Sequence, residues 1–349
     1  MPPGIGILSG GEDRFMAAKW VRILSALCLM AGLAQKAGAA DTVLVPKIES
    51  PWWQVAGSPD LGLYTTARQQ PVDFAIWQAA DGTWQIWSCI RATSYPGWTR
   101  LFYRWEAKSP TDRDWKPMGV VMTSDTQLGE VEGMLQAPYV IRDRGRYVMF
   151  YGTGDHIAVA TSKDGKEFQR RLSPDGTVGL FSDGFGTRDP MTIKVGGIFY
   201  TYYSANPGTV FNADDASAAH RSTLHMAANA DLVRTSPDLK HWSAAKVVAQ
   251  GGQAGTGPYS AECPFVYYDR KSRYYYLFRT QHYGQNAETR VYRSKDPMNF
   301  GVNDDRYWVE TLPVAAPEIF EWKGQLYIAA LLPSLKGIQI AQLGFEEKR

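Results

Sequence analysis

The sequence predicts an all-β protein, a five-bladed β-propeller of four-stranded antiparallel blades, on three observations. After residue 40, helical periodicity is nearly absent, and short β-branched and aromatic runs alternate with clusters of Gly, Asp, Asn and Pro. Five similar units follow, each consisting of an apolar run, a turn and a second run rich in Tyr, Phe or Trp. The unit starts recur every 51 to 74 residues, a range that blade-sized repeats occupy.

The unit starts define the expected blades in order. The first runs are PVDFAIW (71–77), QAPYVIRD (136–143), TRDPMTIK (187–194), AECPFVYYD (261–269) and AAPEIFEWK (315–323). The second runs are GTWQIW, GRYVMFYG, GIFYTYYS, RYYYLF and GQLYIA. In a propeller, the innermost strand of each blade begins near the central axis, so residues from distant segments meet there. We expect one propeller domain over residues 40–349.

A turn motif recurs once in most units. The segments TSKDGKEF (161–168), TSPDLKHW (235–242) and RSKDPMNF (293–300) share Ser-x-Asp-x-x-x-aromatic, and SPTDRDW (109–115) is a looser copy. The Ser and Asp side chains can cap a tight turn while the aromatic residue packs between blades. The motif therefore predicts a structural role for these Asp residues.

Three further segments lie outside the repeats. Residues 51–66 precede the first unit and are expected to form either a closing strand or a lid. Two inserts rich in Ala, Gly, Asn and Asp, Ser204–Leu232 and Val248–Ser260, are predicted to be surface loops. Such loops often shape the mouth of a pocket.

The first 39 residues have the pattern of a secretory signal peptide, with translation expected to start at Met16. A basic stretch ends at Arg22, an apolar stretch runs from Ile23 to Ala34, and small residues follow at 37–39. The apolar stretch is shorter than a membrane span requires, although a membrane-anchored N-terminus is the alternative. We expect a periplasmic or secreted protein, with no membrane association after removal of the signal.

Charge and cysteine content exclude several classes of function. The chain has 37 basic and 35 acidic residues, of which residues 1–39 hold four and two, so 33 of each remain. A neutral mature chain gives no electrostatic reason to bind nucleic acid. Cys89 and Cys263 are too few for a disulfide scaffold and are predicted to be buried free thiols. No metal-ligand spacing, phosphate loop or Ser-His-Asp motif stands out. We expect a monomer that requires no cofactor.

Three acidic residues, Asp73, Asp189 and Glu262, open three of the five units. Carboxylates gathered at the axis repel one another and lose solvent, which separates their pKa values into acid and base roles. The placement therefore predicts a catalytic site. The alternatives are a turn-capping Asp73, a strand-entry turn at Asp189-Pro190 and a solvent-exposed Glu262 at a strand end.

On these residues the chain resembles the five-bladed propeller glycosidases, most closely glycoside hydrolase family 43, with families 32, 62 and 68 as relatives. In that group an Asp opens blade one, an Asp-Pro opens blade three, and a Glu shortly before a Pro opens blade four. The matching residues here are Asp73, Asp189-Pro190 and Glu262-Cys263-Pro264, and the resemblance covers about residues 70–345. Gln136-Ala137-Pro138 and the Ser-x-Asp turns also look like family 43.

Some residues depart from the family-43 pattern. Phe74 follows Asp73 where family 43 usually has Pro, and Arg188-Asp189-Pro190 and Glu262-Cys263 look more like family 32. The Asn-Asp-Pro-Asn-Gly opening of family 32 is missing. Relative to the next Pro, Glu262 sits one position earlier than Asp189, which on an ideal strand would turn it to the other face. The family resemblance shows the same offset.

The resemblance implies a hydrolase acting on a neutral oligo- or polysaccharide with arabinose, xylose, galactose or fructose units. Glu262 would be the general acid, Asp73 the base that activates water, and Asp189 the residue that holds the pKa of the acid and orients its proton. We expect inversion, as in family 43. The alternatives are a retaining fructan-type glycosidase or transferase, with Asp73 as nucleophile, and a non-catalytic carbohydrate-binding propeller.

Several further residues are candidates for binding the substrate. Arg188, beside Asp189, is predicted to bind sugar hydroxyls, and Gln136 opens the second unit. His282 could approach the axis and bind sugar or a metal, because family-43 propellers often hold an axial calcium or water cluster; a structural His is the alternative. The aromatic candidates for stacking on a sugar ring, each with core packing as the alternative, are Trp87, Tyr95 and Trp98.

Overall fold

The structure, a computed structural model, describes residues 43–207 and 228–348. The predicted signal peptide over residues 1–39 and most of the insert that begins at Ser204 lie outside these residues. Within them, every regular element is a β-strand or a 3-10 helix of three residues, so the predicted all-β class is confirmed. None of the helices described is long and apolar enough to cross a membrane.

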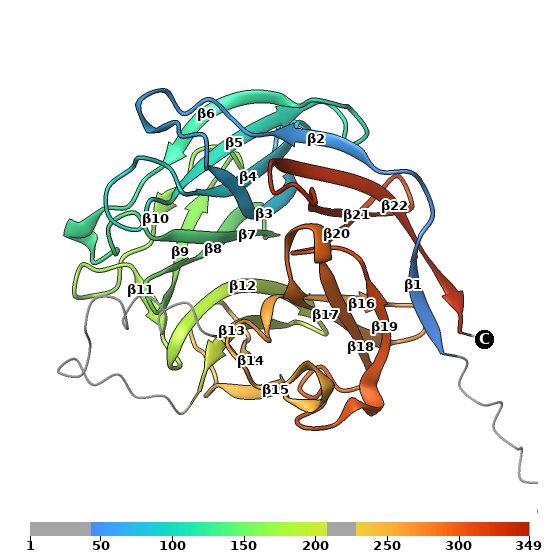
Figure 1. The fold of residues 1–349 in the computed structure, drawn as a ribbon. Helices are drawn as coiled ribbons and strands as arrows, with labels where there is room; N and C mark the ends of the chain where they lie inside the picture. Colours follow the sequence, from blue (N-terminus) through green and yellow to red (C-terminus); the bar gives the residue numbers. More distant parts are fainter. Residues whose placement is uncertain (1–42, 208–227, 349) are drawn as a thin grey trace, which may run out of the picture. The chain divides into compact units, whose positions relative to one another are not determined.

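Five sheets follow one another around a ring, which confirms the predicted five-bladed propeller (Figure 1). Their innermost strands β3, β7, β12, β16 and β20 touch in succession, and β20 returns to β3, so the ring is closed. From the axis outward, the first blade contains β3 (Gln70–Gln78), β4 (Trp84–Arg91), β5 (Leu101–Ala107) and β6 (Lys116–Met122), and the second contains β7 (Leu135–Asp143), β8 (Arg146–Thr153) and β9 (His156–Ser162), with both β10 (Gln169–Arg170) and β11 (Gly179–Phe181) paired to β9. The third blade contains β12 (Phe185–Val195), β13 (Ile198–Asn206), β14 (Ala230–Ser236) and β15 (Lys246–Gln250), and the fourth contains β16 (Glu262–Asp269), β17 (Tyr274–His282), β18 (Glu288–Ser294) and β19 (Trp308–Leu312). The fifth blade contains β20 (Glu318–Trp322), β21 (Gln325–Leu331) and β22 (Gly337–Glu347), with both β1 (Leu44–Ile48) and β2 (Trp53–Gly57) paired to β22.

The fifth blade combines strands from both ends of the described chain. Strands β1 and β2 both pair with β22, so the first strands complete the sheet formed by the last three. Of the two alternatives for residues 51–66, a closing strand is therefore correct for β2. The rest of that segment forms a loop with a short 3-10 helix, Gly62–Tyr64.

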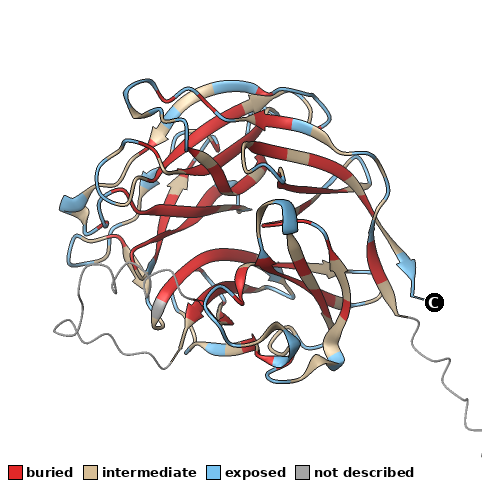
Figure 2. Ribbon diagram, viewed as in Figure 1, coloured by how far each residue is buried: buried red, intermediate tan, exposed pale blue. Residues whose placement is uncertain are grey.

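The second strand of each blade, which holds the aromatic run, is largely buried, and much of the interior of the blades is buried as well (Figure 2). Strand β4 buries seven of its eight residues. The aromatic residues of the turn motif pack between blades, as predicted. Phe168, which follows β9, lies 6.0 Å from Trp77 and 5.2 Å from Trp87 of the first blade, measured between ring centroids. Trp242, which follows β14, packs in the same way on the second blade, 5.6 Å from Phe181.

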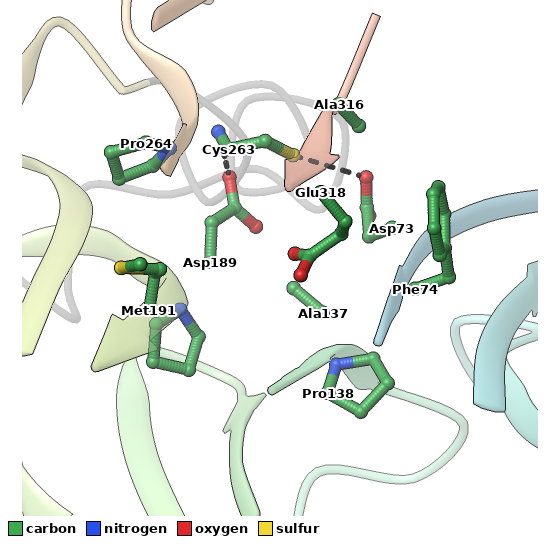
Figure 3. A pocket seen from close by; sticks show the side chains of 11 residues that line it. Asp73, Phe74, Ala137, Pro138, Asp189, Met191, Cys263, Pro264, Ala316 and Glu318 are labelled. Atoms are coloured by element: carbon green, nitrogen blue, oxygen red, sulfur yellow. Dashed lines mark hydrogen bonds between the residues drawn. The ribbon is translucent and has the colours of Figure 1, made fainter. Parts of the chain in front are cut away.

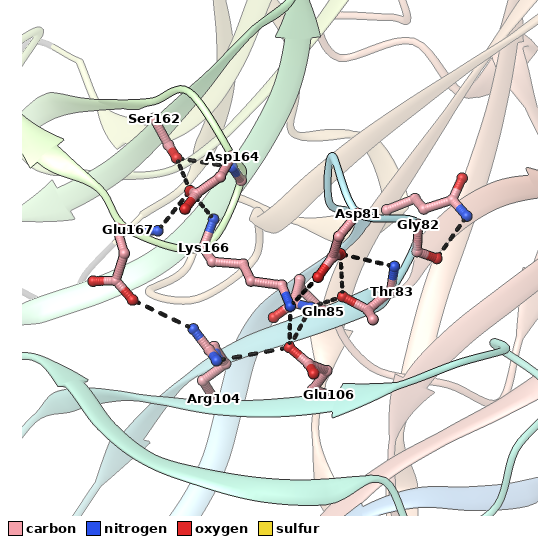
Figure 4. A network of polar contacts seen from close by, with 12 residues as sticks. Asp81, Gly82, Thr83, Gln85, Arg104, Glu106, Ser162, Asp164, Lys166 and Glu167 are labelled. Carbon is pink, nitrogen blue, oxygen red and sulfur yellow. Dashed lines mark hydrogen bonds and ion pairs between the residues drawn. The ribbon is translucent and has the colours of Figure 1, made fainter.

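The polar residues of the turn motif also have the predicted structural role. Ser162 donates a hydrogen bond to Asp164 at 2.7 Å, and Asp164 accepts one from the backbone N–H of Lys166 at 2.8 Å. The ammonium of Lys166 then contacts Asp81 at 2.6 Å and Glu106 at 2.7 Å, both on the first blade (Figure 4). Surface ion pairs of this kind contribute about 1 kcal/mol or less each.

Both predicted inserts are shorter than the sequence indicated. Ser204 lies in β13 and Leu232 in β14, and Val248 lies in β15. The second insert is therefore the loop of residues 251–261, which contains a short 3-10 helix, Gly252–Ala254.

Candidate active site

Each blade has one non-glycine residue at a positive φ angle near the start of its innermost strand, and all five of these residues line one cavity (Figure 3). The φ angles are 39° at Asp73, 46° at Ala137, 57° at Asp189, 45° at Cys263 and 48° at Ala316. Strand pairing is irregular at the first four, as in β-bulges, which re-aim side chains and are common next to active sites. Because a non-glycine residue is strained at positive φ and such strain clusters at active sites, this fivefold repeat makes the cavity a candidate functional site.

The cavity on the axis has a volume of about 20 Å³. Its carboxyl groups come from Asp73, Asp189 and Glu318, on the first, third and fifth blades, and Phe74 and Met191 provide apolar wall. A space of this size holds one water molecule. A sugar ring would therefore lie beside the cavity and not within it.

Glu262 occupies the position just before the bulge residue Cys263. Its carboxyl group is buried and bonded to the guanidinium of Arg188, whose Nε also lies 3.6 Å from Asp189. Arg188 is 2% exposed and donates a further hydrogen bond to the carbonyl of Gly186 at 3.1 Å. The structure therefore brings Glu262 and Asp189 together around one buried cation. Arg188 is directed to these carboxylates, so its predicted contact with sugar hydroxyls does not fit its position.

Cys263 and Tyr283 link the acidic residues of different blades. The backbone N–H of Cys263 donates to Asp189 at 3.1 Å, and its thiol donates to Asp73 at 3.3 Å. The Tyr283 hydroxyl lies 3.2 Å from the same sulfur and 3.5 Å from Glu262 Oε2. Cys263 is thus a free thiol but only half buried, since it faces the cavity, whereas Cys89 is fully buried as predicted. Sequence reasoning singled out His282 and missed Tyr283 beside it.

The electrostatics of the cluster suit a proton donor. Burial raises the pKa of Glu262 to about 8; the positive charge of Arg188 opposes this rise, and the carboxylates of Asp189 and Asp73 add to it. Burial likewise raises the pKa of Asp189, against the effect of Arg188. The protonated form of Glu262 therefore dominates at neutral pH, although the residue contacts a guanidinium.

Glu318 is a fourth carboxyl group that sequence reasoning did not single out. It lies two residues after Ala316, and burial raises its pKa well above the ordinary value. The only signal in the sequence was its place in the fifth unit start, AAPEIFEWK.

Gln136 and Trp87, which were also predicted to bind the substrate, are both buried. Gln136 is 1% exposed and accepts a hydrogen bond from Arg100. Its side chain and that of Arg188 both lie next to Gly152. Trp87 is 2% exposed and packs in the core. The prediction that it stacks on a sugar ring is therefore wrong, and the alternative, core packing, is correct.

The axial cavity is not lined by His282, Tyr95 or Trp98. The His282 side chain is 63% exposed and lies 3.5 Å from Glu288. It does not line the axial cavity but lines a second pocket on the fourth blade, and its predicted role in binding stays a prediction. Tyr95 packs edge-on against Tyr64, with ring centroids 5.1 Å apart. Trp98 is half buried in the same loop, and its role as a stacking residue stays a prediction.

The prediction of an axial calcium also stays open. The cavity offers carboxylate oxygens, which calcium prefers. Among the residues that the structure describes, no group of three or more His, Cys, Asp and Glu side chains is arranged to hold a metal ion.

The raised carboxyl pKa values predict that the protein loses stability as the pH rises from 5 to 9. Besides Glu262 and Glu318, Asp231 has its pKa raised by burial, to about 7. In the folded state these groups keep protons that the unfolded chain has released, so their contribution is fully present below about pH 4 and is lost as the pH rises through the folded pKa values. Turn carboxylates with lowered pKa values, such as Asp238, act at lower pH, outside this window.

Thermal unfolding measured from pH 5 to 9 checks this prediction. The Tm of the wild type should fall across the range, and that of Glu318→Gln should fall less, because Gln has no proton to lose. Glu321→Gln, exposed on the same strand, is the matched control and should follow the wild type. A Tm that is flat or rises with pH, or an identical slope in Glu318→Gln, would contradict the burial of these acids.

Neither a family model nor a curated protein matches the sequence. Solved structures do match the fold. A family-43 β-xylosidase/α-arabinofuranosidase from a compost metagenome, in complex with xylotriose, gives a TM-score of 0.58 at 16% identity over 84% of this chain and 98% of that one. The fold is that of the family-43 glycosidases.

Two other solved structures share this fold. A family-43 enzyme from Xanthomonas citri complexed with xylose gives a TM-score of 0.55 at 14% identity, over 83% of this chain and 90% of that one. An exo-1,5-α-L-arabinanase from a bovine ruminal metagenomic library gives 0.53 at 17% identity, over 80% and 93%. The resemblance to five-bladed propeller glycosidases is therefore confirmed at the level of the fold.

Proposed function

We propose that this protein is a glycoside hydrolase in which Glu262 is the general acid, Asp73 the base and Asp189 the residue that tunes the acid. One observation carries the proposal: the buried carboxyl group of Glu262 shares the guanidinium of Arg188 with Asp189 of another blade, in surroundings that raise its pKa. General acid catalysis near neutral pH needs a donor whose pKa lies close to the working pH.

The contacts of Glu262 suit the transfer of its proton. When the acid protonates the leaving glycosidic oxygen, a negative charge develops on its carboxyl group. Arg188 is already bonded to that group and stabilises the charge without any reorganisation. Asp189 contacts the same guanidinium at 3.6 Å, so it shares the cation and keeps the pKa of Glu262 from falling too far.

The surroundings of Asp73 suit a base that activates water. Its carboxylate accepts a hydrogen bond from the Cys263 thiol and borders a cavity that holds one water molecule. An inverting glycosidase needs space for a water between its base and the anomeric carbon, whereas a retaining one does not. The cavity therefore favours inversion over the retaining alternative.

The similar structures suggest the sugar. Their names include a β-xylosidase/α-arabinofuranosidase in complex with xylotriose and an exo-1,5-α-L-arabinanase. We therefore propose a pentose-containing glycan, with xylose or arabinose units ahead of galactose or fructose. The signal-peptide pattern supports action in the periplasm or outside the cell, and we propose a monomer.

A glycan screen with product analysis tests this function. The wild type should release sugar from at least one xylose- or arabinose-containing glycan, and NMR should show the first-formed anomer with inverted configuration. Retained configuration would mean that Asp73 acts as the nucleophile and not as the base. Binding of glycans with no release from any bound glycan would favour a carbohydrate-binding propeller and contradict the hydrolase.

A further inference from the structure

A second pocket, about 200 Å³ in volume, opens on the fourth blade, and its lining includes residues close to Glu262 in the sequence. Its lining includes Tyr259 and Ser260 of the loop before β16, Gln281 of β17 and Arg290 of β18. Ser260 precedes Glu262 by two residues, and Gln281 follows Thr280, the cross-strand partner of Glu262. The pocket therefore lies within about one sugar length of the general acid, given the spacing of residues in a strand.

The floor of the pocket holds buried polar groups without partners. Gln281 is 9% exposed, and in the described part of the chain neither its amide nitrogen nor its amide oxygen has a hydrogen-bond partner. The same holds for the hydroxyl of Ser260, which is 7% exposed, and for Nη1 of Arg290. Leaving such buried groups unpaired is destabilising, so native proteins rarely do so without a ligand or ordered water.

The rim of the pocket carries a strained aromatic residue. Tyr259 has a φ angle of 65° and is 40% exposed. An aromatic residue in the left-handed region is strained, and such strain often persists at binding sites. Gly257 and Pro258, which precede it in the loop, line the same pocket, and the exposure of Tyr259 is that of a surface residue and not of a core residue.

The chemistry of the lining favours a polyhydroxylated ligand. The unpaired groups include both donors and acceptors, which match sugar hydroxyls, and the exposed ring offers an apolar face for stacking. An anion would need donors alone, and the carboxylate of Glu288, bonded to Arg290 at 2.9 Å, would repel it.

We propose that this pocket binds the sugar unit on the leaving-group side of the scissile bond. The inference rests on the proposed function, because a general acid touches the glycosidic oxygen and the leaving group must lie on its side. Tyr259 would stack on that sugar unit, while Gln281, Ser260 and Arg290 bind its hydroxyls. The pocket therefore selects the group to which the glycone is attached.

Substrates with different leaving groups test the inference. The ratio of kcat/KM for a trisaccharide, such as xylotriose, to that for a p-nitrophenyl glycoside of the same glycone should fall tenfold or more in Tyr259→Ala, chiefly through KM for the trisaccharide. Gln281→Met, which keeps the volume but removes the amide, should lower the same ratio. Tyr268→Ala, near the far end of β16, is the matched control and should keep the wild-type ratio.

Two results would overturn the inference while leaving the hydrolase in place: an unchanged ratio in both pocket variants, or an equal fall in Tyr268→Ala. If the wild type cleaves no glycoside, the proposed function fails, and calorimetric titration with xylotriose then decides for the pocket. Saturable binding that Tyr259→Ala weakens and Tyr268→Ala does not would support the site. Its absence, or equal binding in both variants, would refute it.

Discussion

Asp73→Asn should abolish hydrolysis of natural and activated glycosides alike, with a loss of at least about 10²- to 10⁴-fold in kcat. Asn cannot take a proton from water, and a better leaving group does not help, because water must attack with either substrate. The fold should persist. Asn tolerates positive φ, which is 39° here, and it keeps an oxygen to accept the hydrogen bond from the Cys263 thiol.

Asp143→Asn is the matched control for this variant. Asp143 ends the innermost strand β7, away from the strand starts that line the cavity, and pairs with Lys194 at 2.7 Å. Its variant should keep wild-type kcat on both kinds of substrate. Turnover of either substrate by Asp73→Asn at more than a tenth of the wild-type rate would remove Asp73 from the mechanism.

The fold could be predicted because its signals are local. Each unit start proved to be an innermost strand, since an apolar run, a turn and an aromatic run specify two neighbouring strands without long-range information. The insert bounds could not be predicted. Ser204 and Val248 have a loop-like local composition, yet Ser204 pairs with Arg188 across the sheet and Val248 is fully buried. Cross-strand pairing outweighed local composition at both positions.

The site could be predicted only in part, because bulges change which way side chains point. On an ideal strand, Glu262 and Asp189 would face opposite sides, given their offset from the next Pro. The positive φ angle of Cys263 breaks that alternation, and both carboxyl groups reach Arg188. No sequence pattern separates the half-buried Glu318, which lines the cavity, from the exposed Glu321 three residues later.

The second large effect is expected for Glu262→Gln. Gln keeps the volume and much of the hydrogen bonding but has no proton to give, so cleavage of natural glycosides should slow by about 10²- to 10⁴-fold. The Tm at pH 7 should hold, because Gln resembles the protonated carboxyl group that burial favours there. Its amide oxygen still accepts a hydrogen bond from Arg188, which avoids leaving that buried cation without its partner.

The leaving-group dependence of Glu262→Gln tests the central claim most directly. The measurement compares kcat/KM of wild type and variant on a natural glycoside and on a dinitrophenyl glycoside with the same glycone. Dinitrophenolate departs without protonation, so the proposed mechanism predicts a large loss on the natural substrate and a much smaller one on the activated substrate. An equal loss on both substrates would show that Glu262 is not the general acid.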